Sequence, residues 1–309
     1  RCLKKQFPET ELHFLIKKQF KSVIEYNPYI DKIHEYHGNF REMIHNLKYE
    51  KFTHIVDLQN NLRSNRIKRR LKVEASTVNK INIRKWLYVS LKINKLPKKH
   101  IVDRYFDTLK PLNVIPDNQG LEYYSEPDAH NIINQLPEFT KKGYIVAVAG
   151  AAHYTKQIPR DIFVQILNKS KFPVVFTGSG SDKEKTQEII KNLDIPFFDT
   201  CGLCSIGQTA EIIRHARVVL TPDTGAMHIA SAFNRPVVSL WGNTVPEFGM
   251  YPYMPDNNSN FFIAQVENLK CRPCSKIGFK HCPKKHFRCM NNQNVEQISE
   301  KIIHFWNQQ

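Results

Sequence analysis

One stretch in the second half of the chain combines the residue types that bind phosphate, and it reads Asp223-Thr224-Gly225-Ala226-Met227-His228. The apolar run 218–220 precedes it and a segment with helical spacing follows it, so we expect a strand, a turn and a helix. Asp223 or Thr224 can cap that helix, and Gly225 lets a ligand approach the backbone. The amides after Thr224 and the positive end of the helix dipole then favour an anion, with His228 facing it. The plain alternative is an ordinary strand–turn–helix of an α/β core.

Two further predicted strands end in small-residue turns with a polar group close by. Gly242-Asn243-Thr244 follows one apolar run, and Gly150 follows another, with Lys156 six positions later. Small residues admit a ligand, and a lysine ammonium is a suitable point charge for a diphosphate. The alternatives are a common strand-end glycine and a lysine that simply faces solvent.

Asp182 follows a fourth strand, after the turn Gly178-Ser179-Gly180-Ser181. Its carboxylate can accept hydrogen bonds from ribose hydroxyls, as acidic residues do in dinucleotide-binding folds. It can equally be the N-cap of the next helix. Four strand ends that carry such groups predict together a site for a nucleotide diphosphate.

A doubly wound parallel sheet is the architecture that brings these strand ends together. The apolar patterns predict strands and helices in strict alternation after residue 143, the strands over 144–149, 173–177, 217–221 and 236–241, and the helices near 159–169, 182–193, 207–216 and 225–233.

The first half shows strand candidates at 11–16 and 54–58 and a cationic amphipathic helix over 63–72. Proline punctuates 111–143, which predicts a linker. We therefore expect an α/β protein of two Rossmann-like domains facing a cleft. The first domain is expected at 1–138, and the second at 139–309 with a cysteine-rich segment and a C-terminal helix.

The 309 residues carry a formal net charge of +16. Residues 63–99 hold 13 Lys or Arg against the single acid Glu74, and the helix candidate contributes Arg63, Arg66, Arg69 and Arg70. A basic region attracts nucleic acid, an anionic membrane or a phosphorylated substrate, unless it is only a solvated face. A nucleic-acid-binding protein is accordingly one alternative, and it predicts affinity that falls steeply with salt.

Seven cysteines in a large α/β-type chain favour a reducing cytoplasm over a disulfide scaffold. No apolar run has the length of a membrane span, and no signal peptide is visible. Four of the cysteines form a C-terminal segment, Cys271, Cys274, Cys282 and Cys289, with His281 and His286 nearby. Zinc is one interpretation, but the paired spacing of a strong site is missing, and free thiols or a local disulfide are favoured. No metal ligand is assigned.

The motif Asp223-Thr224-Gly225-x-x-His228, followed by a short strand and Trp241-Gly242-x-Thr244, closely resembles the signature of glycosyltransferase family nine, the lipopolysaccharide heptosyltransferases. The resemblance extends over nearly the whole chain. It includes Asp57-Leu58 with Leu62-Arg63-Ser64, Gly150 with Lys156 and Pro159 (Ile158 stands where the family has Trp), and the cysteine segment.

The resemblance implies a GT-B fold and inverting, metal-independent transfer of a heptose from ADP-heptose to the lipopolysaccharide inner core. It implies a cytoplasmic monomer at the inner face of the inner membrane, with no cofactor and no nucleic acid partner. Lys156, Asp223 and His228 are then the catalytic residues. The donor is bound by Gly150, Asp182, Thr224, Gly225, Ala226, Met227, Gly242 and Thr244, and the acceptor by Asp57, Arg63, Arg66, Arg69 and Arg70.

One feature departs from the family pattern. Family members begin with a strand and a Gly-Asp loop whose carboxylate is the expected general base, and nothing before Cys2 supplies it. The first domain is therefore expected to be truncated at its N-terminus, and Asp57 is the remaining strand-end carboxylate in that half. A non-catalytic sugar-nucleotide binder and a nucleotide-sugar epimerase of the same build remain alternatives.

Overall fold

The computed structural model describes residues 1–308. The chain divides into two compact units. The first consists of Arg1–Asn82 with Pro97–Asn118, and the second of Ile83–Leu96 with the chain from Gln119 onward. This division differs from the expected boundary at residue 138, because the 3₁₀ helix Ala129–Gln135 packs against a helix of the second unit.

The second unit is built on one sheet of six parallel strands in the order β10-β9-β8-β5-β6-β7. This is the Rossmann order, in which the chain reverses direction across the sheet at the β5–β8 pair. The strands are β5 (Ile145–Ala147), β6 (Val174–Phe176), β7 (Phe197–Asp199), β8 (Val218–Pro222), β9 (Val237–Trp241) and β10 (Phe261–Gln265).

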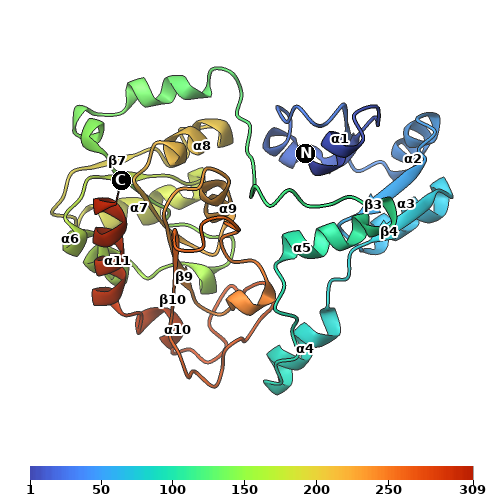
Figure 1. The fold of residues 1–309 in the computed structure, drawn as a ribbon. Coiled ribbons are helices and arrows are strands. Elements are labelled where there is room, and N and C mark those ends of the chain that lie inside the picture. Colours follow the sequence, from blue (N-terminus) through green and yellow to red (C-terminus); the bar gives the residue numbers. More distant parts are fainter. Residues whose placement is uncertain (309) are drawn as a thin grey trace. The chain divides into compact units, whose positions relative to one another are not determined.

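Helices cover both faces of this sheet (Figure 1). One face is packed by α6 (Arg160–Ser170), α7 (Lys183–Ile190) and α11 (Val295–Asn307). The other is packed by α8 (Ile206–Arg214) and α9 (Gly225–Ala232).

The residues of β8 show why both faces are covered. Val218 and Leu220 pack into the core under α6 and α11, whereas Val219 packs on the opposite side with α8 and α9. All three side chains are fully buried. Alternate residues of a strand point to opposite faces, so a strand that is apolar throughout requires two helical layers. The predicted doubly wound sheet is confirmed.

Two strands of this unit were not among the predicted elements. β7 is three residues long and follows Pro196, and β10 follows a polar, asparagine-rich turn. Both lie at the edges of the sheet, where an apolar run of three to five residues is hard to distinguish from a loop. The predicted C-terminal helix is α11, which packs against α6 and completes that layer.

The first unit contains two separate two-stranded parallel sheets. β1 (His13–Lys17) pairs with β2 (Lys32–Tyr36), and β3 (His54–Asp57) pairs with β4 (Glu74–Thr77). The predicted strands at 11–16 and 54–58 correspond to β1 and β3. Each pair is a parallel α/β unit of the expected kind, but hydrogen bonds between the described strands do not join the pairs into one sheet.

Two amphipathic helices provide the small core of this unit, α2 (Phe40–Tyr49) and α3 (Leu62–Leu71). Both begin at asparagine caps, and at α3 the Asn61 side chain accepts from the Ser64 amide while Ser64 accepts from the Asn61 amide. This reciprocal capping box explains why the cationic helix begins at Leu62. The short helices α1 (Cys2–Gln6) and α5 (Ile101–Phe106) complete the unit.

Helix α4 (Asn82–Leu91) belongs almost entirely to the second unit. Just beyond it, Lys92 donates through Nζ to the carbonyl oxygens of Cys271, at 3.2 Å, and Pro273, at 2.7 Å. These bonds tie 83–96 to the cysteine segment and explain why the basic region 63–99 is shared between the units. Within residues 1–308, no helix combines the length and apolar character that crossing a bilayer requires.

Candidate functional site

Lys156 and Asp223 form an ion pair where the strand order of the second unit reverses. Lys156 ends the 3₁₀ turn Tyr154–Lys156 after β5, and Asp223 directly follows β8. Lys156 Nζ lies 2.6 Å from Asp223 Oδ2 and 3.4 Å from the Asp223 carbonyl oxygen. The side chains are 18% and 10% exposed, so the pair is shielded while the ammonium keeps access to solvent. Ligands of open α/β sheets bind beyond the carboxyl ends of the strands at such a switch point.

The glycine turn after β9 supports this pair. Thr244 Oγ1 donates to Asp223 Oδ2 over 3.0 Å, and Arg272 Nη2 donates to the Thr244 carbonyl oxygen over 2.9 Å. Thr244 is almost completely buried. The predicted proximity of Lys156, Asp223 and Thr244 therefore exists in the structure, and Arg272 adds a positioning contact that the motifs did not indicate.

The start of α9 has backbone amides without a side-chain cap. Thr224 occupies the N-cap position, but its hydroxyl pairs with Thr221 Oγ1 at 2.9 Å and makes no capping bond. The prediction that Asp223 or Thr224 caps the helix is wrong, because Asp223 is engaged by Lys156 and Thr244. A Cβ placed on exposed Gly225 would meet no atom within 4 Å. The uncapped helix start therefore faces open space.

The next three residues of α9 differ in what they can offer to a ligand. Ala226 is partly buried and Met227 is fully buried in the core beneath the helix. Only their backbone amides are available to an anion. His228 is partly buried, and burial lowers its pKa, with Lys156 adding to the effect and Asp223 opposing it. Burial therefore favours the neutral imidazole of His228 over the charged form.

Gly242 and Gly150 are required by packing rather than by an approaching ligand. A Cβ on Gly242 would lie 2.7 Å from the Thr155 carbonyl oxygen, and one on Gly150 would lie 2.0 Å from Asp182 Oδ1. Gly242 thus lets the β9 turn contact the segment that carries Lys156. Gly150 makes room for the Asp182 carboxylate at the end of β5.

Asp182 closes a capping box with Ser179, whose amide and hydroxyl donate to Asp182 Oδ2 over 2.8 and 2.6 Å. Asp182 stands at the N-cap position of α7 but its side chain makes no capping bond to that helix, so the carboxylate caps the preceding 3₁₀ turn Gly180–Asp182 instead. The side chain also lines a hollow of about 260 Å³ with Gln157, Lys185 and other polar residues. Gln157, which follows Lys156 in the chain, is one of its lining residues.

Lys185 and Asn243 were not nominated from the sequence. Lys185 Nζ donates to the Ala149 carbonyl oxygen over 2.9 Å, and burial lowers its pKa to about 8. Asn243 is 1% exposed, and no hydrogen-bond partner for its side-chain amide is found among the described residues. Buried polar groups are normally hydrogen-bonded. The signal that could have identified them is their position in the chain. Asn243 lies in the turn that follows β9, and Lys185 lies in the first turn of α7, the helix after β6.

Asp57, placed on the acceptor side, has a structural role. Oδ1 accepts from the amides of Gln59 and Asn60 at 2.9 and 2.8 Å, and Oδ2 pairs with Lys68 Nζ at 2.8 Å. Burial raises its pKa, but Lys68 and the amides outweigh that effect and lower it overall. A carboxylate held ionised in this way is a poor proton acceptor. Asp57 does not fit the role of general base.

The four predicted acceptor arginines lie on α3 and are all exposed. Arg63 stacks over the Tyr36 ring and Arg66 over the Phe40 ring, each at 4.5 Å from the ring centroid. Arg69 and Arg70 lie in the last turn. Across residues 1–308, these four guanidinium groups have no carboxylate within ion-pair distance. The four arginines of α3 therefore carry positive charge that no neighbouring carboxylate neutralises. They belong to the first unit, whereas Lys156 and Asp223 belong to the second.

The C-terminal cysteines are unpaired thiols in the structure. Cys271 Sγ lies 3.8 Å from His286 Nε2. Burial raises the pKa of Cys289 to about 12 and raises that of Cys274. Among the described residues the four sulfurs do not come together as a metal site.

Comparison with known proteins gives the same family that the sequence motifs resemble, over most of the chain. A model of glycosyltransferase family 9 (heptosyltransferase) matches residues 40–288. A lipooligosaccharide heptosyltransferase 2 from Haemophilus influenzae is 25% identical, with 90% of this chain and 87% of that protein covered.

Two solved structures share the fold. A family 9 glycosyl transferase from Veillonella parvula superposes with a TM-score of 0.78 at 17% identity, covering 100% of this chain and 92% of that one. The ADP-heptose LPS heptosyltransferase II of E. coli superposes with a TM-score of 0.72 at 18% identity, covering 100% and 93%. The predicted α/β fold of GT-B type is confirmed.

Proposed function

Because the chain belongs to glycosyltransferase family 9, the heptosyltransferase family, we propose that it transfers a heptose or related sugar from ADP-heptose to the lipopolysaccharide inner core, with inversion at the anomeric carbon. The names of its relatives support this choice. One acts in lipooligosaccharide synthesis, and the E. coli structure is described as using ADP-heptose. The single observation that carries the proposal is the Lys156–Asp223 pair at the switch point of the sheet.

In the proposed reaction an acceptor hydroxyl oxygen forms a bond to the anomeric carbon as the bond from that carbon to the donor phosphate breaks. The bonding electrons leave with ADP, so negative charge develops on the diphosphate. Lys156 and the uncapped amides of Gly225, Ala226 and Met227 stabilise that charge. Such preorganised donors lower the barrier because they act more strongly on the transition state than on the ground state.

Asp223 is a positioning residue in this scheme. Its carboxylate restrains Lys156 and Thr244, and Arg272 fixes the Thr244 backbone in turn. Asp182 and the hollow beside Lys185 offer carboxylate oxygens and an ammonium to the ribose end of the nucleotide. The reaction needs no metal or other cofactor in this proposal. The neutral imidazole of His228 donates a hydrogen bond to the phosphate through its N–H.

The acceptor side of the proposal rests on α3. Its arginines attract the phosphate and carboxylate groups of a lipopolysaccharide core, and they also favour an anionic membrane surface. We propose that the enzyme works as a monomer on the cytoplasmic side of the inner membrane, bound peripherally. The proton of the attacking hydroxyl goes to a general base, which in the family pattern is the carboxylate of an N-terminal Gly-Asp loop.

The test measures nucleotide binding and sugar transfer on the same preparations. Thermal shifts with ADP, UDP, GDP and CMP are expected to show stabilisation by ADP, and a preference for UDP contradicts the donor assignment. Lys156→Gln is expected to lower the rate of sugar transfer, measured as ADP released from ADP-heptose in the presence of acceptor lipid, by about a hundredfold or more. This is the typical loss of rate for one charge-stabilising donor.

The matched control is Lys169→Gln, a lysine of the same unit that pairs with Glu296 at the surface. It is expected to keep full activity. Binding of ADP without any transfer of sugar identifies the non-catalytic alternative, and product formed without acceptor identifies an epimerase.

A further inference from the structure

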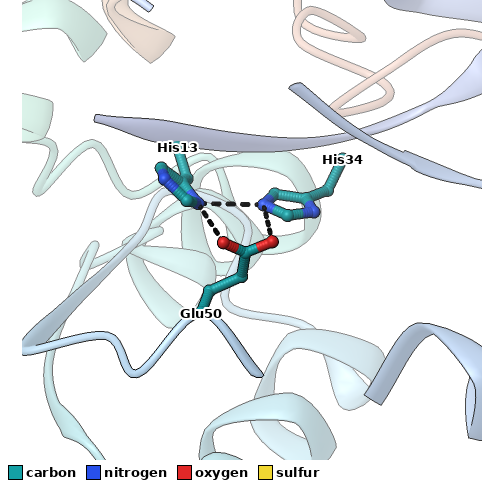
Figure 2. A group of neighbouring side chains, drawn as sticks. All are labelled: His13, His34 and Glu50. Atoms are coloured by element: carbon teal, nitrogen blue, oxygen red, sulfur yellow. Dashed lines mark hydrogen bonds and ion pairs between the residues drawn. The ribbon is translucent and has the colours of Figure 1, made fainter. Parts of the chain in front are cut away.

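Three side chains of the first unit converge on one point that the proposed transferase reaction does not use. They are His13 on β1, His34 on β2 and Glu50, the C-cap residue that directly follows α2. Figure 2 shows the two rings and the carboxylate turned toward one another. The side chains are 7%, 12% and 20% exposed, so the cluster is largely shielded from water.

The strand register explains how the two histidines meet. β1 and β2 are parallel, with His13 opposite Lys32 and Leu15 opposite His34. Residues two apart share a face of a strand, so both histidines project from the same face as diagonal neighbours. Leu15 packs on the α2 core from this face, which brings the end of α2 and Glu50 over the histidines.

The distances suit one ion. His13 Nδ1 lies 3.0 Å from His34 Nε2, while Glu50 Oε2 lies 3.8 Å from the first nitrogen and Oε1 lies 3.9 Å from the second. Two ligands bound to one zinc ion at about 2.1 Å can be at most about 4.2 Å apart. The three separations fall within that limit, although Glu50 reaches the two nitrogens through different oxygens. With one ligand atom from each side chain, all three atoms lie within 4.8 Å of one another.

A second carboxylate sets the protonation of His13. Glu11 Oε1 lies 3.0 Å from His13 Nε2, where it can accept a hydrogen bond from that nitrogen and leave the lone pair of Nδ1 for the cluster. Metal-binding histidines commonly donate their other N–H to a carboxylate in this way. Lys32 Nζ holds Glu50 Oε1 at 2.5 Å, which leaves Oε2 to face His13.

We propose that His13, His34 and Glu50 bind a divalent first-row transition-metal ion of the zinc class. Two imidazoles and one carboxylate are a ligand set typical of zinc and its neighbours in that series. The ion joins β1, β2 and the end of α2, three elements of a unit whose buried core is small. It therefore stabilises this unit and takes no part in the chemistry at Lys156.

The test uses the whole chain, freed of metal with a chelator and then titrated with Zn²⁺ by calorimetry and with Co²⁺ by visible absorption. Wild type is expected to bind one equivalent that His34→Gln and Glu50→Gln lose, with a raised unfolding temperature in wild type alone. Glu11→Gln, a substitution at an exposed position, is expected to weaken binding about 10- to 100-fold. It keeps the test decisive if His34→Gln does not fold.

The matched control is His45→Gln, an exposed histidine of α2, which is expected to bind like wild type. Equal binding by wild type and the His34, Glu50 and Glu11 variants overturns the proposal, as does an absence of binding. A sulfur-to-cobalt charge-transfer band that accounts for the bound equivalent also overturns it, because it assigns the ion to the cysteines. None of these readouts depends on transferase activity.

Discussion

A single carboxylate oxygen at Asp223 accepts from both Lys156 and Thr244. These residues come from three different strand ends, yet they meet because parallel strands present their carboxyl ends on one edge of a sheet. The backbone there is controlled by glycines with opposite requirements. Gly242 has no room for a side chain, whereas Gly225 has nothing above it.

The two glycines predict opposite effects of the same substitution. Gly242→Ala forces a Cβ toward the Thr155 backbone and is expected to lower the unfolding temperature and to displace Lys156. Gly225→Ala is expected to retain or slightly raise stability, since alanine is favoured over glycine in a helix by about 1 kcal/mol, and to weaken ADP binding by crowding the phosphate. Thermal unfolding and ADP titration of both variants separate these effects. Unchanged ADP affinity in Gly225→Ala contradicts a phosphate at the start of α9.

His228 predicts a pH effect with a definite sign. Burial holds its pKa below the ordinary value of 6.5, so the unfolded chain binds the proton more readily than the folded one. The contribution of His228 to stability is therefore present above pH 6.5 and is lost as the pH falls below it. The unfolding free energy of wild type is expected to decline more between pH 7.5 and 5 than that of His228→Gln. Parallel pH profiles contradict the buried, neutral state of this histidine.

At the scale of the element, helix α3 presents the arginines that are proposed to bind the acceptor. Its capping box fixes where the helix begins, Ile67 anchors it in the core, and its arginines remain at the surface. Arg63 and Arg66 are restrained by aromatic rings, while Arg69 and Arg70 lie in the last turn, where cations also interact favourably with the helix dipole.

Reversing the charge at the end of α3 is expected to separate acceptor use from donor binding. Arg69→Glu with Arg70→Glu is expected to raise the KM for the lipid acceptor tenfold or more, roughly 1.4 kcal/mol, and to leave ADP affinity unchanged. The control is Lys17→Glu with Lys18→Glu, an exposed basic pair of the same unit outside α3. Equal loss of donor and acceptor affinity in the α3 variant is the contrary result.

The elements of the second unit could be predicted from the sequence because their signals are local. Each long strand is an apolar run bounded by turn residues, and each helix repeats its apolar positions every three or four residues. The site residues Lys156, Asp223 and Thr244 follow from the same signals, since they stand where those strands end. The capping of α9 could not be predicted this way, because Asp223 is diverted by partners 21 and 67 positions away.

The first unit shows where local signals are insufficient. β2 and β4 are half-exposed strands of polar sequence, and Glu74–Thr77 contains one buried residue. The cluster of His13, His34 and Glu50 depends on register and on the end of α2, and neither is visible in residue spacing. Asp57 resembles a functional carboxylate in sequence, but its ion pair with Lys68 emerges only after α3 packs beside β3.

For the whole molecule, chemistry and charge are divided between residues far apart in the chain. The second unit holds the strand-end groups assigned to the nucleotide sugar, and α3 of the first unit holds cations assigned to an acidic acceptor. This division agrees with membership of a family that joins two substrates. The net charge of +16 favours encounter with an anionic surface.

Hydrogen exchange with and without ADP tests the central claim most directly, because it locates the nucleotide on the chain. ADP is expected to slow amide exchange in peptides spanning 150–158 and 221–229, which carry Lys156 and the uncapped start of α9. The same peptides of Lys156→Gln are expected to show much weaker protection. Protection confined to the first unit, with 150–158 and 221–229 exchanging as fast as without ADP, contradicts a diphosphate site at the β5–β8 switch point.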